Sequence, residues 1–322
     1  MKVSVIIALY NTEKYVEKCI TSVLESPLNR NDYEIIVIND GSTDNSQEIV
    51  ESLQNEYSNI LLINKQNGGQ STARNLGFEI AKGEYIYCLD SDDFINGIAF
   101  NEALDYAIAN NLDMLPIHYT TLNENYELVD QKPDNYEITS ELITGGDFMN
   151  KFVVSGTMWR YFYKTSIIRE HRLSLLEGVY HEDEEFVVRF LSRSKKIAYK
   201  RHNVYNYIKR QNSTVNNKNI AHRLKLIDDL ITVVSSLDTH SKRFETNSLE
   251  YIGIVKKKEQ LLVSIFFRMK SDKLSKNQVE SKIKILKEAK LFPLELNYQF
   301  FKFKIAAFLF NKKVFRNLYF NK

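Results

Sequence analysis

Residues 85–93 read YIYCLDSDD, five apolar or aromatic residues followed at once by Asp90, Ser91, Asp92 and Asp93. A short run of this composition predicts a buried β-strand. Three carboxylates within four residues repel one another unless a cation binds them, and Mg²⁺ and Mn²⁺ favour oxygen ligands. Because ligands of open α/β sheets bind beyond the carboxyl ends of the strands, the stretch predicts a divalent-cation site at a strand end.

The chain up to about residue 120 alternates short strand signals with helical periodicity. Strands are expected at 3–9, 34–38, 60–63, 85–89 and 114–119, and helices at 13–24, 45–56, 71–81 and 97–110. This alternation predicts an α/β fold with a mostly parallel central sheet and helices on both of its faces.

The pattern changes further along the chain. Residues 123–136, which include Pro133, predict an excursion of the chain or a hairpin. A helix is expected at 140–152, a strand at 159–163, a helix at 182–193 and a strand at 197–208. Beyond residue 220 only helices are expected, at 223–237, 251–269 and 277–289. We therefore expect a domain at 1–220, with halves at 1–120 and 121–220, and a smaller all-helical region at 221–322.

Composition excludes several classes of protein. The 322 residues carry 43 Lys and Arg against 41 Asp and Glu, so the near-neutral average gives no sign of a nucleic-acid partner. Cys19 and Cys88 are too few for a disulfide framework, and buried free thiols are expected. The amino terminus lacks the pattern of a signal peptide, and no apolar run reaches the ~20 residues of a membrane span. A cytoplasmic protein, peripheral to a membrane at most, is expected.

The other predicted strand ends also carry polar groups. The first ends in Ala8-Leu9-Tyr10-Asn11, without the glycines of a dinucleotide site, which argues against a dehydrogenase. The second ends at Asp40, either a hydrogen-bond acceptor for a nucleotide or a turn residue. After the third strand, Gly68-Gly69 precedes a helix that carries Arg74. This loop is either an anion-binding site or only a connection between the strand and the helix.

These stretches together resemble the family 2 glycosyltransferases with a GT-A fold, over about the first 215 residues. The resemblance lies in residues 3–11, 35–46, 66–77 and 82–93, and resumes at Trp159 and Glu182-Asp183. It implies a nucleotide-sugar donor, most often a UDP-sugar, and Mg²⁺ or Mn²⁺ as cofactor. The residues it assigns to the nucleotide-sugar are Ala8, Tyr10, Asp40, Arg74, Asp90 and Ser91, and it assigns the metal to Asp92. Asn39 departs from the Asp-Asp-Gly-Ser of many relatives.

The resemblance makes Asp183 the general base of an inverting transfer to an acceptor hydroxyl. Without it, residues 182–185 read as an acidic first helical turn that suits the helix dipole. Trp159, and Glu182 beside the base, are candidates for acceptor binding, although Trp159, Tyr161 and Tyr163 also fit strand packing. Arg210 is a candidate for closing over the diphosphate, or a solvated arginine.

The carboxyl-terminal stretch 290–322 holds seven Lys or Arg, ten Phe or Tyr and one acid, Glu295. An interfacial helix near 300–320 would place the enzyme on a membrane that carries a lipid-linked acceptor. The alternative is packing on the helical region or a dimer interface, and the oligomeric state stays open.

Three other functions remain open at the level of sequence. A sugar-phosphate nucleotidyltransferase also uses acidic metal ligands, but its Gly-rich loop is missing after the first strand. A non-catalytic, carbohydrate-binding or partner-binding relic would not need Asp90, Asp92 and Asp183. A helical scaffold would function through residues after 220. The prediction is an inverting glycosyltransferase that uses a glycan or lipid-linked sugar as acceptor in polysaccharide biosynthesis.

Overall fold

The structure is a computed structural model that describes residues 1–130, 139–210, 219–299 and 301–320. The chain divides into two compact units. The first contains residues 1–145, 155–178 and 193–211, and the second contains 146–154, 179–192 and 212–322. The units alternate along the sequence, and the functional division of the chain at residues 120 and 220 stays a prediction.

The first unit is built on an eight-stranded sheet of order β3-β2-β1-β4-β10-β6-β11-β9. Its strands are β1 (Val3–Leu9), β2 (Tyr33–Asn39), β3 (Ile60–Asn64), β4 (Tyr85–Asp90), β6 (Met114–Pro116), β9 (Thr139–Ile143), β10 (Tyr161–Lys164) and β11 (Ile197–Tyr199). The strands β3, β2, β1 and β4 run parallel, whereas β10 is antiparallel to both β4 and β6. The chain order reverses between β1 and β4, the point where α/β sheets open a crevice for ligands.

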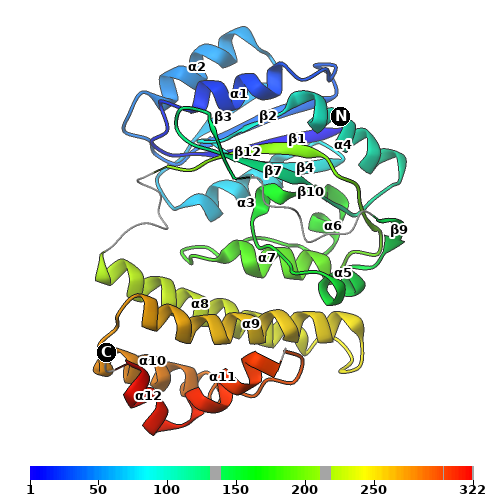
Figure 1. Cartoon of the computed structure of the whole chain (residues 1–322). Helices are drawn as coiled ribbons and strands as arrows, with labels where there is room; N and C mark the ends of the chain where they lie inside the picture. The colour runs from blue at the N-terminus through cyan, green and yellow to red at the C-terminus, as the bar shows by residue number, and fades with distance from the viewer. Residues whose placement is uncertain (131–138, 211–218, 300, 321–322) are drawn as a thin grey trace. The chain divides into compact units, whose positions relative to one another are not determined.

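Helices cover both faces of this sheet, as the sequence predicts (Figure 1). They are α1 (Val16–Leu24), α2 (Ser46–Glu56), α3 (Gln70–Ile80) and α4 (Gly97–Ala109), with the short α6 (Thr165–Glu170) further along. Val5 and Ile7 of β1 share one core with α1 and α4. Ile6 points to the other face, against α3, so closely that a Cβ on Gly77 would lie 2.5 Å from it. Both cysteines are buried and free, as expected.

A second sheet of the same unit has the order β5-β12-β7-β8. Its strands are β5 (Phe94–Ile95), β12 (Asn203–Ile208), β7 (His118–Leu122) and β8 (Leu128–Asp130). The antiparallel pair β7–β8 confirms the first part of the predicted hairpin. Pro133 lies outside the described residues. Because β12 pairs with β5, which directly follows the acidic residues of β4, this sheet borders the predicted metal site.

Four predicted elements are wrong in part. The helix expected at 140–152 is the strand β9 followed by α5 (Gly145–Lys151), since Ile143 pairs with Ile197 of β11. The strand expected at 159–163 begins as a 3₁₀ turn, Met158–Arg160. The strand expected at 197–208 is split between two sheets at residues 200–202, which include the exposed Lys200 and Arg201. The strand expected at 114–119 is divided after Pro116, which has no N–H to continue a ladder.

The second unit is helical. Besides most of α5 it contains α7 (Glu182–Leu191), α8 (Ile220–Ser241), α9 (Leu249–Ser271), α10 (Lys276–Glu288), α11 (Phe301–Asn311) and α12 (Lys313–Phe320). The predicted helices 182–193, 223–237, 251–269 and 277–289 are thus confirmed. Long apolar sides of α8 and α9 are buried within the unit. Among the described residues, no helix is long and apolar enough to cross a membrane.

Candidate functional site

The carboxylates that end β4 lie together in the first unit. Ligand atoms of Asp90, Asp92 and Asp93 all lie within 4.8 Å of one another. Arg74 of α3 is buried and donates to Asp90 through Nη2 at 2.7 Å. One fixed cation thus offsets part of a concentrated negative charge, and the oxygen atoms left over are the ligand type that hard divalent cations take. Arg74 and the carboxylate cluster, which the sequence singled out separately, are therefore joined by an ion pair.

Asp93 is a site residue that the sequence analysis left without a role. Its carboxylate accepts hydrogen bonds from the Tyr205 hydroxyl and the Ile208 N–H, both at 2.6 Å. Burial raises the pKa of the Asp93 carboxyl well above its ordinary value, and the charges of Asp92 and Asp90 raise it further. Asp93 therefore fastens β12 to the end of β4. In the sequence Asp93 is the third carboxylate of the motif, but the resemblance assigned roles only to Asp90 and Asp92.

Asp92 faces Arg210, which follows β12. The two side chains form an ion pair, and the Arg210 guanidinium also lies 5.5 Å from the centre of the Tyr15 ring. Burial raises the pKa of the Asp92 carboxyl, as does the charge of Asp90, whereas Arg210 lowers it. A carboxylate whose environment disfavours its charge gains most from a bound cation. The donor set therefore fits Mg²⁺ or Mn²⁺ chemically, with Arg210 as the cation now beside it. His202, at the start of the segment that leads into β12, is not part of this cluster.

Asp40 organises the loop after β3. Its carboxylate accepts hydrogen bonds from Lys65 Nζ at 2.5 Å, Gly68 N at 2.9 Å and Gly69 N at 2.7 Å, and the residue is only 3% exposed. Gly69 has a φ of +89°, which strains any residue with a Cβ. The Gly-Gly pair thus lets two backbone N–H groups turn toward one carboxylate. Lys65 was not singled out from the sequence, because its partner lies 25 residues away.

The side-chain amide of Asn39 forms hydrogen bonds at the end of β2. Its Nδ2 donates to Asn64 Oδ1 at 2.8 Å, and its Oδ1 accepts from Ser42 N at 3.0 Å. An amide can donate and accept at once, whereas an ionised carboxylate only accepts. Asn39 therefore joins the ends of β2 and β3 beside Asp40.

The end of β1 lies next to the end of β4. Ala8 pairs in register with Asp90, Tyr10 is 50% exposed, and Ser91 is buried and accepts a hydrogen bond from the Thr12 hydroxyl at 3.0 Å. Asp40 follows on the neighbouring strand, where its N–H bonds to the carbonyl of Leu9 at 2.9 Å. The predicted nucleotide-binding residues are thus gathered at adjoining strand ends.

Trp159 lies in an aromatic group in the first unit. Its ring stacks on Tyr205 at 4.1 Å and meets Tyr119 edge-on at 5.0 Å. Tyr161 and Tyr163 are fully buried, which confirms packing for two of the three aromatic residues. Trp159 is itself 7% exposed, so its role toward an acceptor stays a prediction.

Asp183 and Glu182 belong to the second unit, where they open α7. Asp183 Oδ1 accepts from Glu184 N at 2.9 Å, and Glu182 is 1% exposed. The preceding His181 has a left-handed φ of 67° and receives a hydrogen bond from Arg268 at 2.7 Å. Burial lowers the pKa of His181, and the Arg268 charge lowers it further. A neutral histidine thus anchors the turn that carries Asp183.

Comparison with known proteins fits this arrangement. The chain is 30% identical over 224 residues to the uncharacterized glycosyltransferase EpsJ of Bacillus subtilis, covering 66% of this chain and 62% of that protein. It is 28% identical to the poly(ribitol-phosphate) beta-glucosyltransferase of Bacillus spizizenii, covering 62% of this chain and 31% of the relative. The match thus spans about three fifths of the first relative and a third of the second.

The fold is shared with TarS of S. aureus, crystallised as residues 1–349 in complex with UDP-GlcNAc. The TM-score is 0.68 at 20% identity, and the superposition covers 90% of this chain and 81% of that one. This likeness shows the GT-A fold. The family described as glycosyl transferase family 2 matches residues 4–168, which include every strand-end residue discussed above from Ala8 to Asp93. The chain therefore belongs to glycosyl transferase family 2.

Proposed function

We propose that the chain transfers a sugar from a nucleotide-sugar, a UDP-sugar, to a hydroxyl of a glycan or lipid-linked acceptor in polysaccharide synthesis, with inversion at the anomeric carbon. The observation that carries the proposal is the cluster of Asp90, Asp92 and Asp93 beside Arg74. Mixed charge of this kind at strand ends suits a diphosphate held through a divalent cation. The names of the relatives, one of which transfers glucose and one of which binds UDP-GlcNAc, support the donor and acceptor classes.

The donor would lie across the ends of β1, β2 and β4. Ala8 and Tyr10 offer backbone and an exposed ring to the nucleotide, and Ser91 adds a hydroxyl. Asp40 would contact the base, with Lys65 and the Gly68-Gly69 turn holding it in place. Asp90 would face the ribose, oriented by Arg74.

Asp92 would hold the metal, which when bound neutralises charge that develops on the leaving diphosphate. Asp93 would keep the cluster in shape through Tyr205 and Ile208. Arg210 would leave Asp92 when the cation arrives and could then pair with a phosphate. In these roles Asp92, Asp93 and Arg210 stabilise charge, and none of them forms or breaks a covalent bond.

Asp183 would take the proton of the acceptor hydroxyl as that oxygen attacks the anomeric carbon from the face opposite the diphosphate. A single displacement of this kind inverts the configuration, and general-base assistance contributes about 10²–10⁴ in rate. Trp159 and Glu182 would help to position the acceptor sugar. Because nucleotide-sugars are cytoplasmic metabolites, we place the chain in the cytoplasm, at the inner face of the membrane when the acceptor is lipid-linked.

A product assay tests the proposal. A panel of UDP- and GDP-sugars should give release of the nucleoside diphosphate and a product of inverted configuration. Asp183→Asn should lower transfer by about two to four orders of magnitude while donor binding persists. Glu48→Gln is the matched control, since Glu48 is an exposed acid in the first turn of α2 and loses only the favourable helix-dipole contact.

Three results would contradict the proposal in whole or in part. Release of pyrophosphate instead of a nucleoside diphosphate would assign a nucleotidyltransferase. Absence of any nucleotide binding, with or without Mg²⁺ or Mn²⁺, would make the chain a non-catalytic relic. Full transfer activity in Asp183→Asn would keep the enzyme class and remove the assigned base.

A further inference from the structure

Helix α11 leaves a stripe of apolar side chains exposed. Phe301 is 77% exposed, Ile305 44% and Phe308 62%. Spacings of four and three residues put these side chains on one face of a helix. The opposite face is already used within the second unit, because Ala307 and Phe310 are buried and Phe310 stacks on Phe266 of α9 at 4.8 Å. The helix is thus apolar on both sides, and only one side is covered.

Helix α12 repeats the arrangement over a shorter length. Val314 is 73% exposed and Leu318 68%, four residues apart, while Arg316 and Phe320 on the other side are buried. Singly exposed apolar residues are ordinary on protein surfaces, whereas grouped ones mark interaction sites, and both helices expose their apolar residues as stripes. We call Phe301, Ile305, Phe308, Val314 and Leu318 the apolar face.

Positive charge accompanies the apolar face. Lys302, Lys304, Lys312 and Lys313 are exposed, and no Asp or Glu follows Glu295 in the sequence. On an ideal helix Lys302 and Lys304 fall on either side of the stripe that begins at Phe301. The Lys312 ammonium lies 5.1 Å from the centre of the Phe308 ring. Cations therefore border the exposed rings.

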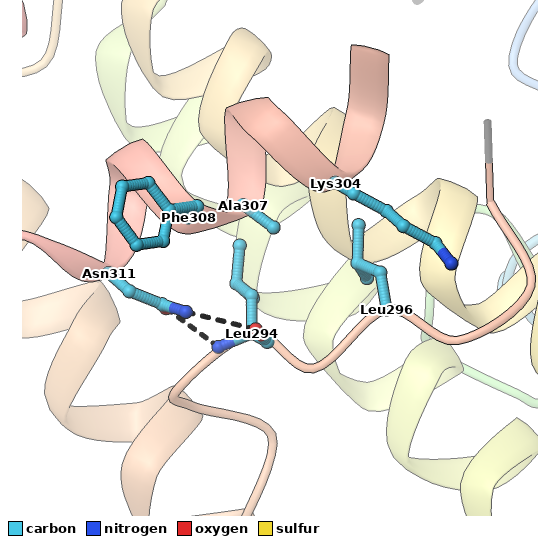
Figure 2. A pocket seen from close by; sticks show the side chains of 6 residues that line it. All are labelled: Leu294, Leu296, Lys304, Ala307, Phe308 and Asn311. Atoms are coloured by element: carbon cyan, nitrogen blue, oxygen red, sulfur yellow. Dashed lines mark hydrogen bonds between the residues drawn. The ribbon is translucent and has the colours of Figure 1, made fainter. Parts of the chain in front are cut away.

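A small cavity opens beside the stripe (Figure 2). Its volume is about 160 Å³, and its lining consists of Leu294, Leu296, Lys304, Ala307, Phe308 and Asn311. Asn311 forms two hydrogen bonds with the backbone of Leu294, which hold the cavity wall to α11. Because Phe308 and Lys304 belong to both features, the apolar surface continues inward from the stripe with a lysine at its edge.

We propose that the apolar face docks on the surface of an anionic lipid bilayer, with α11 lying in the interface between headgroups and acyl chains. Exposed aromatic and aliphatic side chains bordered by lysines are the composition of such interfacial helices. A bilayer carries negative charge that complements the lysines. A symmetric contact between two copies would instead bring the lysines of both copies together, and like charges in a contact are unfavourable. This inference goes beyond the proposed reaction and does not depend on it.

Flotation of the full chain with liposomes tests the docking surface. Vesicles of phosphatidylcholine and phosphatidylglycerol at about 7:3 should carry the protein upward, pure phosphatidylcholine should not, and high salt should weaken binding. The double variant Phe301→Ser with Phe308→Ser should lose at least about ten-fold in affinity. Lys302→Glu with Lys313→Glu should lose more than ten-fold, since each surface lysine contributes about five-fold.

The control is Ile98→Ser, which removes an apolar side chain that is 67% exposed on α4 of the first unit. It should float like the unchanged chain. All of the changed side chains are exposed, and unchanged thermal melting would show that the variants fold. Equal flotation of the Phe301/Phe308 variant and the unchanged chain would overturn the proposal. So would a concentration-dependent dimer that this variant abolishes, because a second copy would then cover the apolar face. Either failure leaves the transferase assay unaffected.

Discussion

Replacing Asp40 with asparagine should destabilise the first unit even in the absence of nucleotide. The carboxylate accepts from Lys65, Gly68 N and Gly69 N, and the residue is 3% exposed. An asparagine keeps one oxygen, but its amide hydrogens meet at least one of these donors. Hydrogen bonds to charged groups contribute about 1.5–3 kcal/mol, and removal of one partner of a buried ion pair costs about 3–5 kcal/mol. Because Lys65 is partly exposed, we expect a loss near the lower limit, about 3 kcal/mol.

Thermal denaturation without ligand measures this loss. For a unit of this size about 3 kcal/mol corresponds to a fall of roughly 6–12 °C in Tm. Asp130→Asn is the matched control, because Asp130 is an exposed aspartate of β8 in the same unit, and it should shift Tm by very little. Lys65→Met combined with Asp40→Asn should cost less than the sum of the two single changes, since contacting partners are coupled.

If the Asp40→Asn variant has the same Tm as the Asp130→Asn control, the hydrogen bonds of Asp40 are not a source of stability. A strictly additive double variant would refute the coupling between Asp40 and Lys65. The distinction bears on function, because a loss of activity on changing Asp40 would otherwise be assigned wholly to a contact with the base. Nucleotide affinity of the variant should therefore be measured well below its Tm.

The other predictions concern the charges of Asp92, Arg210 and His181. Asp92→Asn should abolish the gain in UDP affinity that Mn²⁺ gives in calorimetry, whereas equal affinities with metal and with chelator would remove the metal site. Arg210→Gln should raise Mn²⁺ affinity roughly five-fold, since Arg210 now competes for Asp92 in a partly exposed ion pair and such a pair contributes about 1 kcal/mol. His181 should titrate below its ordinary value of 6.5 in a nitrogen-15 NMR titration, and Arg268→Met should raise that pKa. Its lowered folded-state pKa means that the His181 contribution to stability is present above pH 6.5 and falls as the pH falls below it, which denaturant melts at pH 7.5 and 5.5 would detect or contradict.

Apolar periodicity over short stretches of sequence was sufficient to predict the strands and helices of the amino-terminal part of the fold. The strands β1 to β4 and the helices between them follow from apolar periodicity, and their order places Ala8 beside Asp90. The first part of the helix expected at 140–152 is instead a strand, because pairing with β11 outweighs its intrinsic preference, whereas residues 145–151 are helical. Long-range partners have no local signal, so Lys65 was not predicted for Asp40.

The acidic motif shows the same limit within four residues. Asp92 and Asp93 are adjacent and chemically alike in the sequence, yet one faces Arg210 and the other is buried under β12. Which of two neighbouring carboxylates points inward depends on the turn between β4 and β5 and on tyrosine and backbone donors far along the chain. Only the folded arrangement separates the two.

The attachment of Asp93 to β12 has a consequence for how the protein is made. Its two hydrogen-bond donors lie 112 and 115 residues downstream, so the acidic end of β4 closes only through contacts of high sequence separation. Such contacts form slowly, because a long loop must close before they give any stability. A nascent chain that has left the ribosome only as far as α4 holds every strand of the parallel core, yet it leaves Asp93 without its donors. We therefore expect the predicted cation site to be among the last features of the first unit to assemble during synthesis.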